Sequence, residues 1–592
     1  MTDVPFPLLT TPGQRPQVSG GRLINCYPEP NAATAGKPYS YWRVPGLGVW
    51  GTAPSGTYRG GVQVGGTFYA LFGTTLYSYT SLGGAGVALT GAVTGSAYCW
   101  FAVNQNAPAD IAIVSPGVGA FSVNTSTGAV ISYGPPGGPP DPNIGTPNSV
   151  VFMFGFFIFT YGSGLTRASN LNSTVINTLN NANAQSKADT LFRPVPMGNG
   201  QCLLCGSTTI EVWASSPVNP AGYPFSYVST IYRGIPGPQA IAGNEDGWGK
   251  GIFFVGDDNK VSTLTGYTPT PISVPDLDIL IESEPDKSKI IVGVYVSRGH
   301  GFVVVQGPNW CWEYDTTIQS WHERASYLQR FWRGFQPICL NFSNSPLWVC
   351  GDTLASDLLK IDGTIRKEGG TNDVQTITVT GTPTGGTFKL SFGGIVTGNI
   401  NFNAAASDVQ TALNALPALA GNVSCAGGPF PGTPVVVTFI NQLATSPQGL
   451  IALATNSLTG GASPNVAIAH TTTGVLPNPL RMRIETGPLG AFPRKVRINT
   501  IEVYMTKGAS NALGHVPDET NAMIDVSISR DGGQNWGNPR QLTIGQQSIT
   551  DGRARASIWG QADIQGVRWR FDESAGINYA FMGADMLSDV LR

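Results

Sequence analysis

Short apolar runs alternate with small polar turns through much of this chain, and one unit shows the pattern most clearly. An apolar run over residues 203–205 ends at Gly206, two or three small polar residues follow, and a second run alternates over residues 210–214. β-Branched and aromatic residues favour strands, while glycine and small polar residues favour the turn between them. The pattern predicts a β-hairpin over residues 203–214.

The same unit recurs at a regular spacing. In each of seven copies an apolar run reaches a glycine and continues as a second strand-like run, and successive turn glycines lie 44, 45, 44, 50, 51 and 44 residues apart. All-β repeats of roughly this length are typical of propeller blades. We therefore predict a β-propeller-like core of six or seven blades. Its predicted blade turns are Gly73, Gly117, Gly162, Gly206, Gly256, Gly307 and Gly351.

The composition agrees with a turn-rich, weakly charged β protein. The 592 residues include 76 glycines and 44 prolines, 41% are hydrophobic and only 12% are charged. A chain of this length with this hydrophobic fraction is expected to form several packed domains. The net charge of −2, without a block of like charge, indicates no strong attraction to nucleic acid or membrane. Transient contact with DNA in a channel stays compatible with it, because tight phosphate contacts would arrest sliding.

The pattern divides the chain into four segments. Residues 1–57 are interpreted as an N-terminal arm and closing strand, and residues 58–370 hold the propeller-like repeats. In residues 371–477 charge nearly vanishes and Thr, Gly and Ala dominate, which indicates an inserted module. Residues 478–592 alternate as strands and are interpreted as a C-terminal β-sandwich. The predicted fold class is all-β and multidomain.

The inserted module is predicted to follow a β-β-α-β order. Residues 374–380 and 385–392 alternate as strands. Ser407 and Gln410 have the spacing of a capping box, with Ser407 as the N-cap residue, and Pro417 ends the helix that this box begins. A further strand follows the helix.

Two polar stretches interrupt the repeats. Residues 170–186 are rich in Asn, Ser and Ala and are predicted to form a loop with one short helix. Residues 276–287 carry five acidic side chains, but their spacing lacks the glycine of a calcium-binding EF-hand loop. A solvated face or the start of a helix is the favoured interpretation of this acidic stretch.

One motif near the C-terminus matches a known turn. Residues 529–536 read Ser-Arg-Asp-Gly-Gly-Gln-Asn-Trp, which fits the Asp-box, Ser-x-Asp-x-Gly-x-x-Trp. In that turn the Asp side chain caps backbone N–H groups, a glycine takes a positive φ and the tryptophan packs beneath. Sialidase propellers carry the motif several times, but here it occurs once and outside the repeats, so a structural turn is favoured over a glycosidase. The residues concerned are Ser529, Asp531, Gly533 and Trp536.

The remaining residues predict no catalytic, cofactor-binding or metal site. Cys202 and Cys205 have Cys-x-x-Cys spacing but lie within a predicted strand, which favours buried thiols. The four histidines are far apart, and no nucleophile elbow, phosphate-binding loop or His-Glu-x-x-His helix is present. We expect a protein that is not an enzyme, while paired carboxylates brought together by folding stay open at this point.

The arginines of the last segment allow two interpretations. They form one basic face, suited to an acidic partner subunit or DNA, or they supply ordinary charge at strand edges, which is favoured. The residues are Arg494, Arg497, Arg530, Arg540, Arg553, Arg555, Arg568 and Arg570.

Two further patterns concern targeting. Residues 1–7 show no basic segment followed by an apolar core, so we expect no signal peptide. The longest apolar run, residues 150–159, is too short for a membrane-spanning helix, so no membrane-spanning segment is expected.

The order of several short motifs resembles one protein family. An Arg-x-x-Asn-x-Tyr-Pro-Glu opening at residues 22–29 precedes a Pro-Gly-Leu turn at residues 45–47 and the repeats. A Gly-Ser-Thr-Thr-Ile-Glu-Val-Trp strand at residues 206–213 and an Arg-Gly-Ile segment at residues 233–235 follow. This order is similar to that of the tail hub, or nozzle, proteins of short-tailed bacteriophages, described as packaged-DNA stabilisation proteins.

The resemblance covers residues 20–368 and 478–592. The insertion departs from the family's plan and resembles a module of many phage tail and surface proteins, with a Gly-Gly-Thr-Phe-x-Leu-x-Phe strand at residues 385–392 and a helix over residues 406–417. That module is uninformative about chemistry because it decorates proteins of varied function.

The family resemblance implies a structural virion protein without catalytic residues or cofactors. Six copies would form a homohexameric ring below the portal-adaptor ring, and the stacked rings would enclose a channel that retains packaged double-stranded DNA and conducts it during ejection. Tail fibres, spikes or a needle-like plug would attach to this ring. The protein would reside in the phage tail after assembly in the host cytoplasm.

A receptor- or carbohydrate-binding tail adhesin with a propeller fold is the alternative function. It requires exposed aromatic platforms, for which Trp310, Trp312 and Trp321 are the candidates, although such residues more often lie in a core. A glycosidase is the third interpretation.

Overall fold

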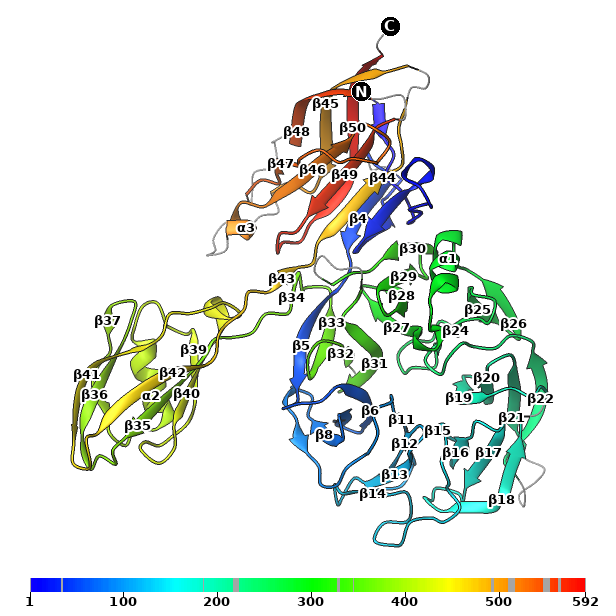
Figure 1. The fold of residues 1–592 in the computed structure, drawn as a ribbon, viewed down its shortest axis with the longest axis horizontal. Coiled ribbons are helices and arrows are strands. Elements are labelled where there is room, and N and C mark those ends of the chain that lie inside the picture. Colours follow the sequence, from blue (N-terminus) through cyan, green and yellow to red (C-terminus); the bar gives the residue numbers. More distant parts are fainter. Residues whose placement is uncertain are drawn as a thin grey trace. The chain divides into compact units, whose positions relative to one another are not determined.

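The computed structural model describes residues 2–33, 36–184, 186–216, 223–326, 331–343, 345–490, 494–508, 517–546, 554–562 and 566–590. Strands dominate these residues, with a few short helices (Figure 1). Two compact units can be distinguished: one contains the propeller and the C-terminal sandwich, and the other spans Lys367–Pro479. No helix among the described residues is long and apolar enough to cross a membrane.

Seven antiparallel sheets form a β-propeller, which confirms the predicted fold. In the first six, four strands pair in the order in which they occur in the chain, and in the first blade one short strand that precedes the fourth pairs with another sheet. These strands are β6 (Tyr58–Val64), β7 (Thr67–Phe72), β8 (Thr75–Tyr79) and β10 (Val87–Ala88); β11 (Trp100–Val103), β12 (Asp110–Ser115), β13 (Gly119–Asn124) and β14 (Val130–Ser132); β15 (Ser149–Met153), β16 (Phe156–Thr160), β17 (Leu165–Ser169) and β18 (Ile176–Asn183); β19 (Leu191–Met197), β20 (Gln201–Gly206), β21 (Ile210–Ser215) and β22 (Phe225–Ile231); β23 (Ile241–Ala242), β24 (Phe253–Val255), β25 (Val261–Thr265) and β26 (Thr268–Pro271); β27 (Ile291–Ser297), β28 (His300–Gly307), β29 (Trp310–Asp315) and β30 (Ser320–Glu323).

The seventh blade combines strands from both ends of the propeller sequence. Strands β31 (Gly334–Phe342), β32 (Ser345–Asp352) and β33 (Asp357–Asp362) come from its end, and β5 (Gly46–Thr52) comes from before its first blade. Strand β5 pairs antiparallel with β33 and extends in parallel to the short β9 (Gly84–Ala85). The ring of blades is therefore closed by hydrogen bonds rather than by a covalent link.

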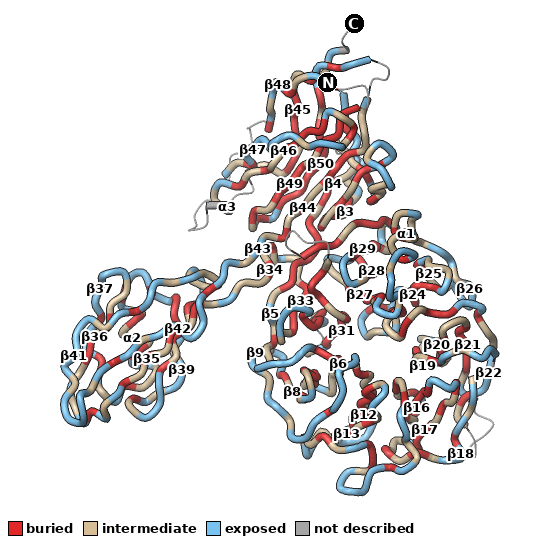
Figure 2. The backbone as a smooth tube through the Cα atoms, viewed as in Figure 1, coloured by how far each residue is buried: buried red, intermediate tan, exposed pale blue. Residues whose placement is uncertain are grey.

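Neighbouring blades pack through alternate residues of their inner strands. Ile111 and Ile113 of β12 pack with the first blade in one buried cluster, while Ala112 and Val114 of the same strand pack with the third blade in another. Because both faces of such a strand are buried, its sequence is a continuous apolar run instead of an alternating one. Buried residues accordingly follow the inner strands, whereas outer strands such as β18 are largely exposed (Figure 2).

The structure agrees with the prediction for one of the two polar stretches and contradicts the prediction for the other. Residues 276–287 contain the helix α1 (Pro275–Ser283) with two acidic residues in its first turn, as expected for a helix start. The 3-10 helix η2 (Lys287–Lys289) follows it. The loop with a short helix predicted for residues 170–186 is wrong, because β18 lies there. Its polar composition reflects an exposed outer strand.

The C-terminal sandwich consists of two sheets around a shared apolar core. One sheet has the order β3-β4-β50-β45-β48, with β1 also paired to β50, and the other has the order β2-β44-β49-β46-β47 and continues from the sixth blade. The strands are β1 (Thr2–Val4), β2 (Gly21–Ile24), β3 (Cys26–Pro30), β4 (Tyr39–Arg43), β44 (Met482–Thr486), β45 (Val496–Met505), β46 (Met523–Ser529), β47 (Arg540–Thr543), β48 (Ala554–Ala562), β49 (Arg568–Glu573) and β50 (Ala580–Val590). The short helices η1 (Pro16–Val18) and α3 (Pro517–Thr520) connect strands of this region.

The expectation of an N-terminal arm over residues 1–57 needs correction. Strands β1 to β4 are integral parts of the sandwich sheets, and only β5 serves as the closing strand. The pairing partners of β1 to β4 lie mostly more than four hundred residues away, as in Thr2 with Met586 and Gly21 with Thr486. Local sequence patterns carry no signal for such distant partners. Strands β1 to β4 therefore looked like an unattached arm in the sequence.

The second unit has its own core and contains more strands than the predicted β-β-α-β order. One sheet has the order β39-β40-β35-β42, and the other joins β37, β36 and β38 with β41. Its elements are β34 (Lys367–Glu368), β35 (Val374–Thr380), β36 (Gly385–Phe392), β37 (Ile395–Val396), β38 (Ile400–Asn401), α2 (Ala406–Asn414), β39 (Val423–Gly427), β40 (Val435–Phe439), η3 (Asn441–Leu443), β41 (Ala452–Thr459), β42 (Asn465–Thr472) and β43 (Asn478–Pro479). The additional strands β41 and β42 are mostly exposed and mix small apolar with polar residues, which hid them in the sequence.

The helix of this module begins earlier than predicted. Ala405, not Ser407, is the N-cap residue, and Asp408 at the third helical position accepts a hydrogen bond from the backbone N–H of Ala405 at 3.0 Å. Gln410 instead accepts a hydrogen bond from the backbone N–H of Cys425 in β39. The carboxylate of Asp408 satisfies an N-terminal N–H group, so a side-chain acceptor on the N-cap residue is dispensable here.

The second unit is predicted to be removable. Lys367 pairs with Pro479 and Glu368 with Asn478, so the chain enters and leaves this unit through one antiparallel pair. Deleting residues 371–476 leaves a three-residue connection, a common hairpin length. We expect the remaining protein to fold with a melting temperature within about 2 °C of the corresponding transition in the full chain. Calorimetry of both proteins measures this, and a deletion protein without a cooperative transition would contradict it.

Candidate partner-binding surface on the C-terminal sandwich

The Asp-box residues form a hydrogen-bonded turn at the end of β46. The Ser529 hydroxyl donates to Asp531 at 2.7 Å and accepts from the backbone N–H of Gly533 at 2.8 Å. One carboxylate oxygen of Asp531 accepts from the backbone N–H groups of Gln534 and Asn535, at 3.1 and 3.0 Å. Partial burial acts to raise the pKa of Asp531, but these hydrogen bonds outweigh it and lower the pKa to about 2.

Gly533 and Trp536 complete this turn through contacts with arginines. Gly533 has a φ of 103°, and a Cβ atom at this position would lie 2.6 Å from the Arg568 guanidinium. Trp536 is half-buried, and the Arg570 guanidinium lies 3.9 Å from the centre of its ring. These side chains therefore stabilise the turn.

The structure separates the arginines of the last segment into two groups. Arg568 is buried and donates to the carbonyl of Thr486 and to the hydroxyl of Ser19, and Arg570 donates to the buried Glu485 at 2.8 Å. These two arginines serve the packing of the sandwich. Exposed arginines form the second group: Arg494, Arg497, Arg530, Arg540 and Arg555. Arg553 lies outside the described residues.

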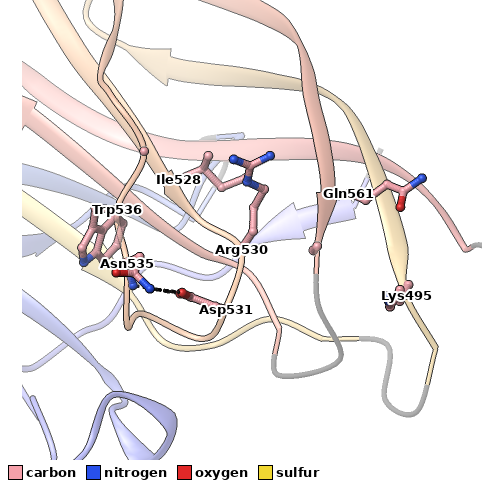
Figure 3. A pocket seen from close by; sticks show the side chains of 9 residues that line it. Lys495, Ile528, Arg530, Asp531, Asn535, Trp536 and Gln561 are labelled. Carbon is pink, nitrogen blue, oxygen red and sulfur yellow. Dashed lines mark hydrogen bonds between the residues drawn. The ribbon is translucent and has the colours of Figure 1, made fainter.

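Four exposed cations gather at one corner of the sandwich, and we name Lys495, Arg497, Arg530 and Arg540 the basic corner. Within the described part of the chain none of the four makes an ion pair. Lys495 and Arg530 line a cavity of about 460 Å³ beside the Asp-box turn. Arg530 lies between that turn and Lys495 and Gln561, which lie just before β45 and in β48 (Figure 3). Sequence reasoning missed Lys495, which only the pairing of β45 with β48 brings to this corner.

A second cavity adjoins the first, and a third adjoins the second. The second, of about 410 Å³, is lined by Arg530, Arg540 and Trp559, and the third, of about 300 Å³, by Arg497 and Thr500. The corner therefore combines concave surface, aromatic walls and unpaired positive charge. Such a surface can bind an anionic partner, because guanidinium groups form charge-assisted hydrogen bonds with carboxylates and phosphates.

Other candidate residues lie in cores. Trp310, Trp312 and Trp321 are 8%, 2% and 2% exposed, so their rings are largely buried, although Trp310 and Trp312 form part of the wall of a surface cavity. Cys202 and Cys205 are buried thiols, and burial raises the pKa of Cys205 to about 12. Among the described residues no group of three or more His, Cys, Asp or Glu side chains is arranged to hold a metal ion.

The seven turn glycines all lie where the second strand of a blade leads into the third. Gly73, Gly117, Gly162 and Gly256 lie in the connecting segments. Gly206 and Gly307 are the last residues of the preceding strand, and Gly351 is the last but one. Of these glycines, Gly73 and Gly117 have positive φ angles, of 55° and 76°. Only at those two positions does the backbone conformation itself favour glycine.

Comparison with known proteins identifies the class to which this propeller belongs. The family model described as "Bacteriophage P22 Gp10, beta-propeller" matches residues 21–366, which include all seven blades. The chain therefore belongs to this family of phage packaged-DNA stabilisation proteins, and it is a structural protein of a phage tail. The matched region begins at β2, in the sandwich, and ends after β33.

Three individual proteins are similar over parts of the chain. A tail sheath protein of Mycobacterium phage Bxz1 is 39% identical over 138 residues, which are 23% of this chain and 22% of that protein. The WD40 propeller domain of Doa1 superimposes with a TM-score of 0.33 at 12% identity, covering 53% of this chain and 96% of that one. The computationally designed Ika8 protein gives a TM-score of 0.33 at 9% identity, covering 60% and 100%.

Removal of the Asp531 carboxylate is predicted to destabilise the turn in a pH-dependent way. The substitution Asp531→Ala leaves two backbone N–H groups without their acceptor, and we expect a loss of about 1–2 kcal/mol at neutral pH. Because the pKa of Asp531 is lowered from 3.8 to about 2 in the folded protein, its contribution is present above pH 4 and is lost as the pH falls towards 2.

Denaturant unfolding of both proteins between pH 2 and pH 7 measures the difference. Asp531→Asn keeps one acceptor oxygen and serves as the control. Its loss at neutral pH is smaller than that of Asp531→Ala, and the difference between the two variants is nearly independent of pH because neither carries the titrating carboxyl group. A difference between wild type and Asp531→Ala that stays constant down to pH 2 would contradict the role of the charge.

Proposed function

We propose that this chain is a subunit of a tail hub, or nozzle, that retains packaged DNA and conducts it during ejection. The observation that carries the proposal is the family match over the whole propeller, residues 21–366. The proposed assembly is a homohexameric ring below the portal-adaptor ring, formed in the host cytoplasm. Tail fibres, spikes or a needle-like plug attach to it.

Two physical features support this proposal. A closed propeller is a rigid body with loops on both faces, so it can present several partner surfaces at once. The small net charge of −2 and the absence of charged blocks suit a conduit, because strong phosphate binding would hold DNA in place during ejection. We propose that the exposed second unit is peripheral to the conduit and that ring assembly does not require it.

A nonsense mutation in the parent phage tests the proposed function. We expect heads that package the genome and then lose it, with tails that end at the portal adaptor. DNA retention is measured by nuclease protection of the encapsidated genome, and tail structure by electron microscopy. Complementation by the full-length chain is the positive control and restores retention.

A different phenotype would contradict the nozzle proposal. Particles without the protein that keep their DNA and a complete channel but fail to attach to cells would identify an adhesin. The buried state of Trp310, Trp312 and Trp321 argues against that function, since an adhesin for carbohydrates requires exposed aromatic faces.

A further inference from the structure

One residue of the sandwich combines an unfavourable conformation with an exposed apolar side chain. Ile558 in β48 has a φ of 65°, in the left-handed region, and its side chain is 80% exposed. β-Branched residues are genuine outliers in this region, where glycine and asparagine are favoured. The isoleucine is therefore strained, and burial within its own chain does not compensate for the strain.

Neighbouring residues fix this conformation. The β45–β48 ladder pairs Ile498 with Gly560 but Thr500 with Ser557, so β48 contains an extra residue here. The Arg540 guanidinium donates to the carbonyls of Ser557 and Ile558 and lies 4.2 Å from the centre of the Trp559 ring. The bulge is thus held from the adjacent sheet, and it points Ile558 away from the core.

A bulge by itself has a protective function, because it keeps an edge strand such as β48 from pairing with other chains. That function does not require isoleucine. Gly560, two residues further on, has a φ of 84° without strain, and glycine at position 558 would form the same bulge. The apolar side chain consequently has a use of its own, and the use that suits an exposed isoleucine is burial against another protein.

The surroundings of Ile558 describe the partner. Two of the cavities at the basic corner share Ile558 in their walls, so it is a knob between two hollows. Arg497, Arg530 and Arg540 surround it with positive charge. Apolar wedges also occur in proteins that bend DNA, but the hollows on both sides of Ile558 favour a protein partner. A protein with an apolar socket and an acidic rim is complementary to the knob and to its positive surroundings.

The same chain carries such a socket on its propeller. A cavity of about 450 Å³ is lined by apolar Pro12, Ile279, Leu280 and Trp310 and by the acidic Asp276 of helix α1. Ile279 is 41% exposed there. Arg22 also lines the cavity, but Glu323 neutralises it through two hydrogen bonds of 2.8 and 2.6 Å.

Acidic residues continue beyond this socket. Asp278 is half-buried and Glu282 exposed on the same helix. Glu284 follows the helix and accepts a hydrogen bond from the Trp310 indole at 3.1 Å. Asp276 in the cavity wall and Glu284 beside Trp310 therefore form an acidic rim, opposite in charge to the basic corner.

We propose that Ile558 of one subunit inserts into the α1 socket of a second copy of this chain, with the basic corner facing the acidic rim. The knob and the socket are different surfaces, so the contact is heterologous and repeats from subunit to subunit until a ring closes. This inference rests on the proposed function, since it supplies the contact that builds the ring.

Cross-linking in the phage particle tests the contact directly. The variant carries Ile558→Cys and Ile279→Cys, and purified virions are treated with a short bis-maleimide. The natural background is low, because seven of the eight cysteines are buried and Cys425 is partly buried. We expect a ladder of covalent multimers from the double variant and none from either single variant.

The outcomes separate the two proposals. A tail in which this chain forms a ring but the double variant cross-links no more than the single variants overturns the interface and leaves the nozzle intact. A tail without such a ring overturns the proposed function and the interface with it. A ring that stays intact in Arg530→Glu while DNA retention falls shows that the corner contacts DNA, which also overturns the interface.

Relief of the strain supplies a second readout. In Ile558→Gly the backbone strain disappears, so we expect the melting temperature of the isolated chain to rise by about 1–2 °C. Loss of the knob is expected to reduce the yield of infectious particles in a complementation assay at least about tenfold. Leu82→Gly, at a position that is 89% exposed, is the matched control and keeps the yield. An unchanged yield for Ile558→Gly would contradict the proposal.

Discussion

The first unit depends on hydrogen bonds between strands in the first fifty residues and strands that lie hundreds of residues further along the chain. Strand β2 lies between β30 of the sixth blade and β44 of the sandwich, and β5 completes the seventh blade beside β33. The buried Arg43 of β4 pairs with the buried Glu573 of β49. Because a buried charge is costly when it is left unpaired, this ion pair also ties the two ends of the chain together.

Closure by these strands explains how the surfaces of the molecule are arranged. Once β5 completes the ring of blades, each inner strand is packed on both faces, and variation is left to loops and outer strands. The Asp-box turn and the arginines that pack against it fix the end of β46 in the sandwich. The rigid turn fixes the position of the basic corner, and the hydrogen bonds from Arg540 to the carbonyls of Ser557 and Ile558 fix the position of Ile558. A partner can therefore recognise both.

The sequence predicted features that depend on local pattern. The spacing from Gly73 to Gly351 gave the propeller, and Ser529, Asp531, Gly533 and Trp536 fall in one turn. Features that depend on distant pairing were missed. Strands β1 to β4 looked like an arm because their partners lie at the other end of the chain, and nothing around Ile558 signals a positive φ in a run that reads as ordinary strand. The basic corner likewise needed the fold, because Arg568 and Arg570 cannot be told from Arg530 and Arg540 by sequence alone.

Cryo-electron microscopy of the tail of the parent phage would locate this chain in the assembled particle. We predict a symmetric ring of this propeller directly below the portal adaptor, with a central channel continuous with the portal. A reconstruction that places the chain only at the ends of fibres, or outside any ring around the channel, would contradict it.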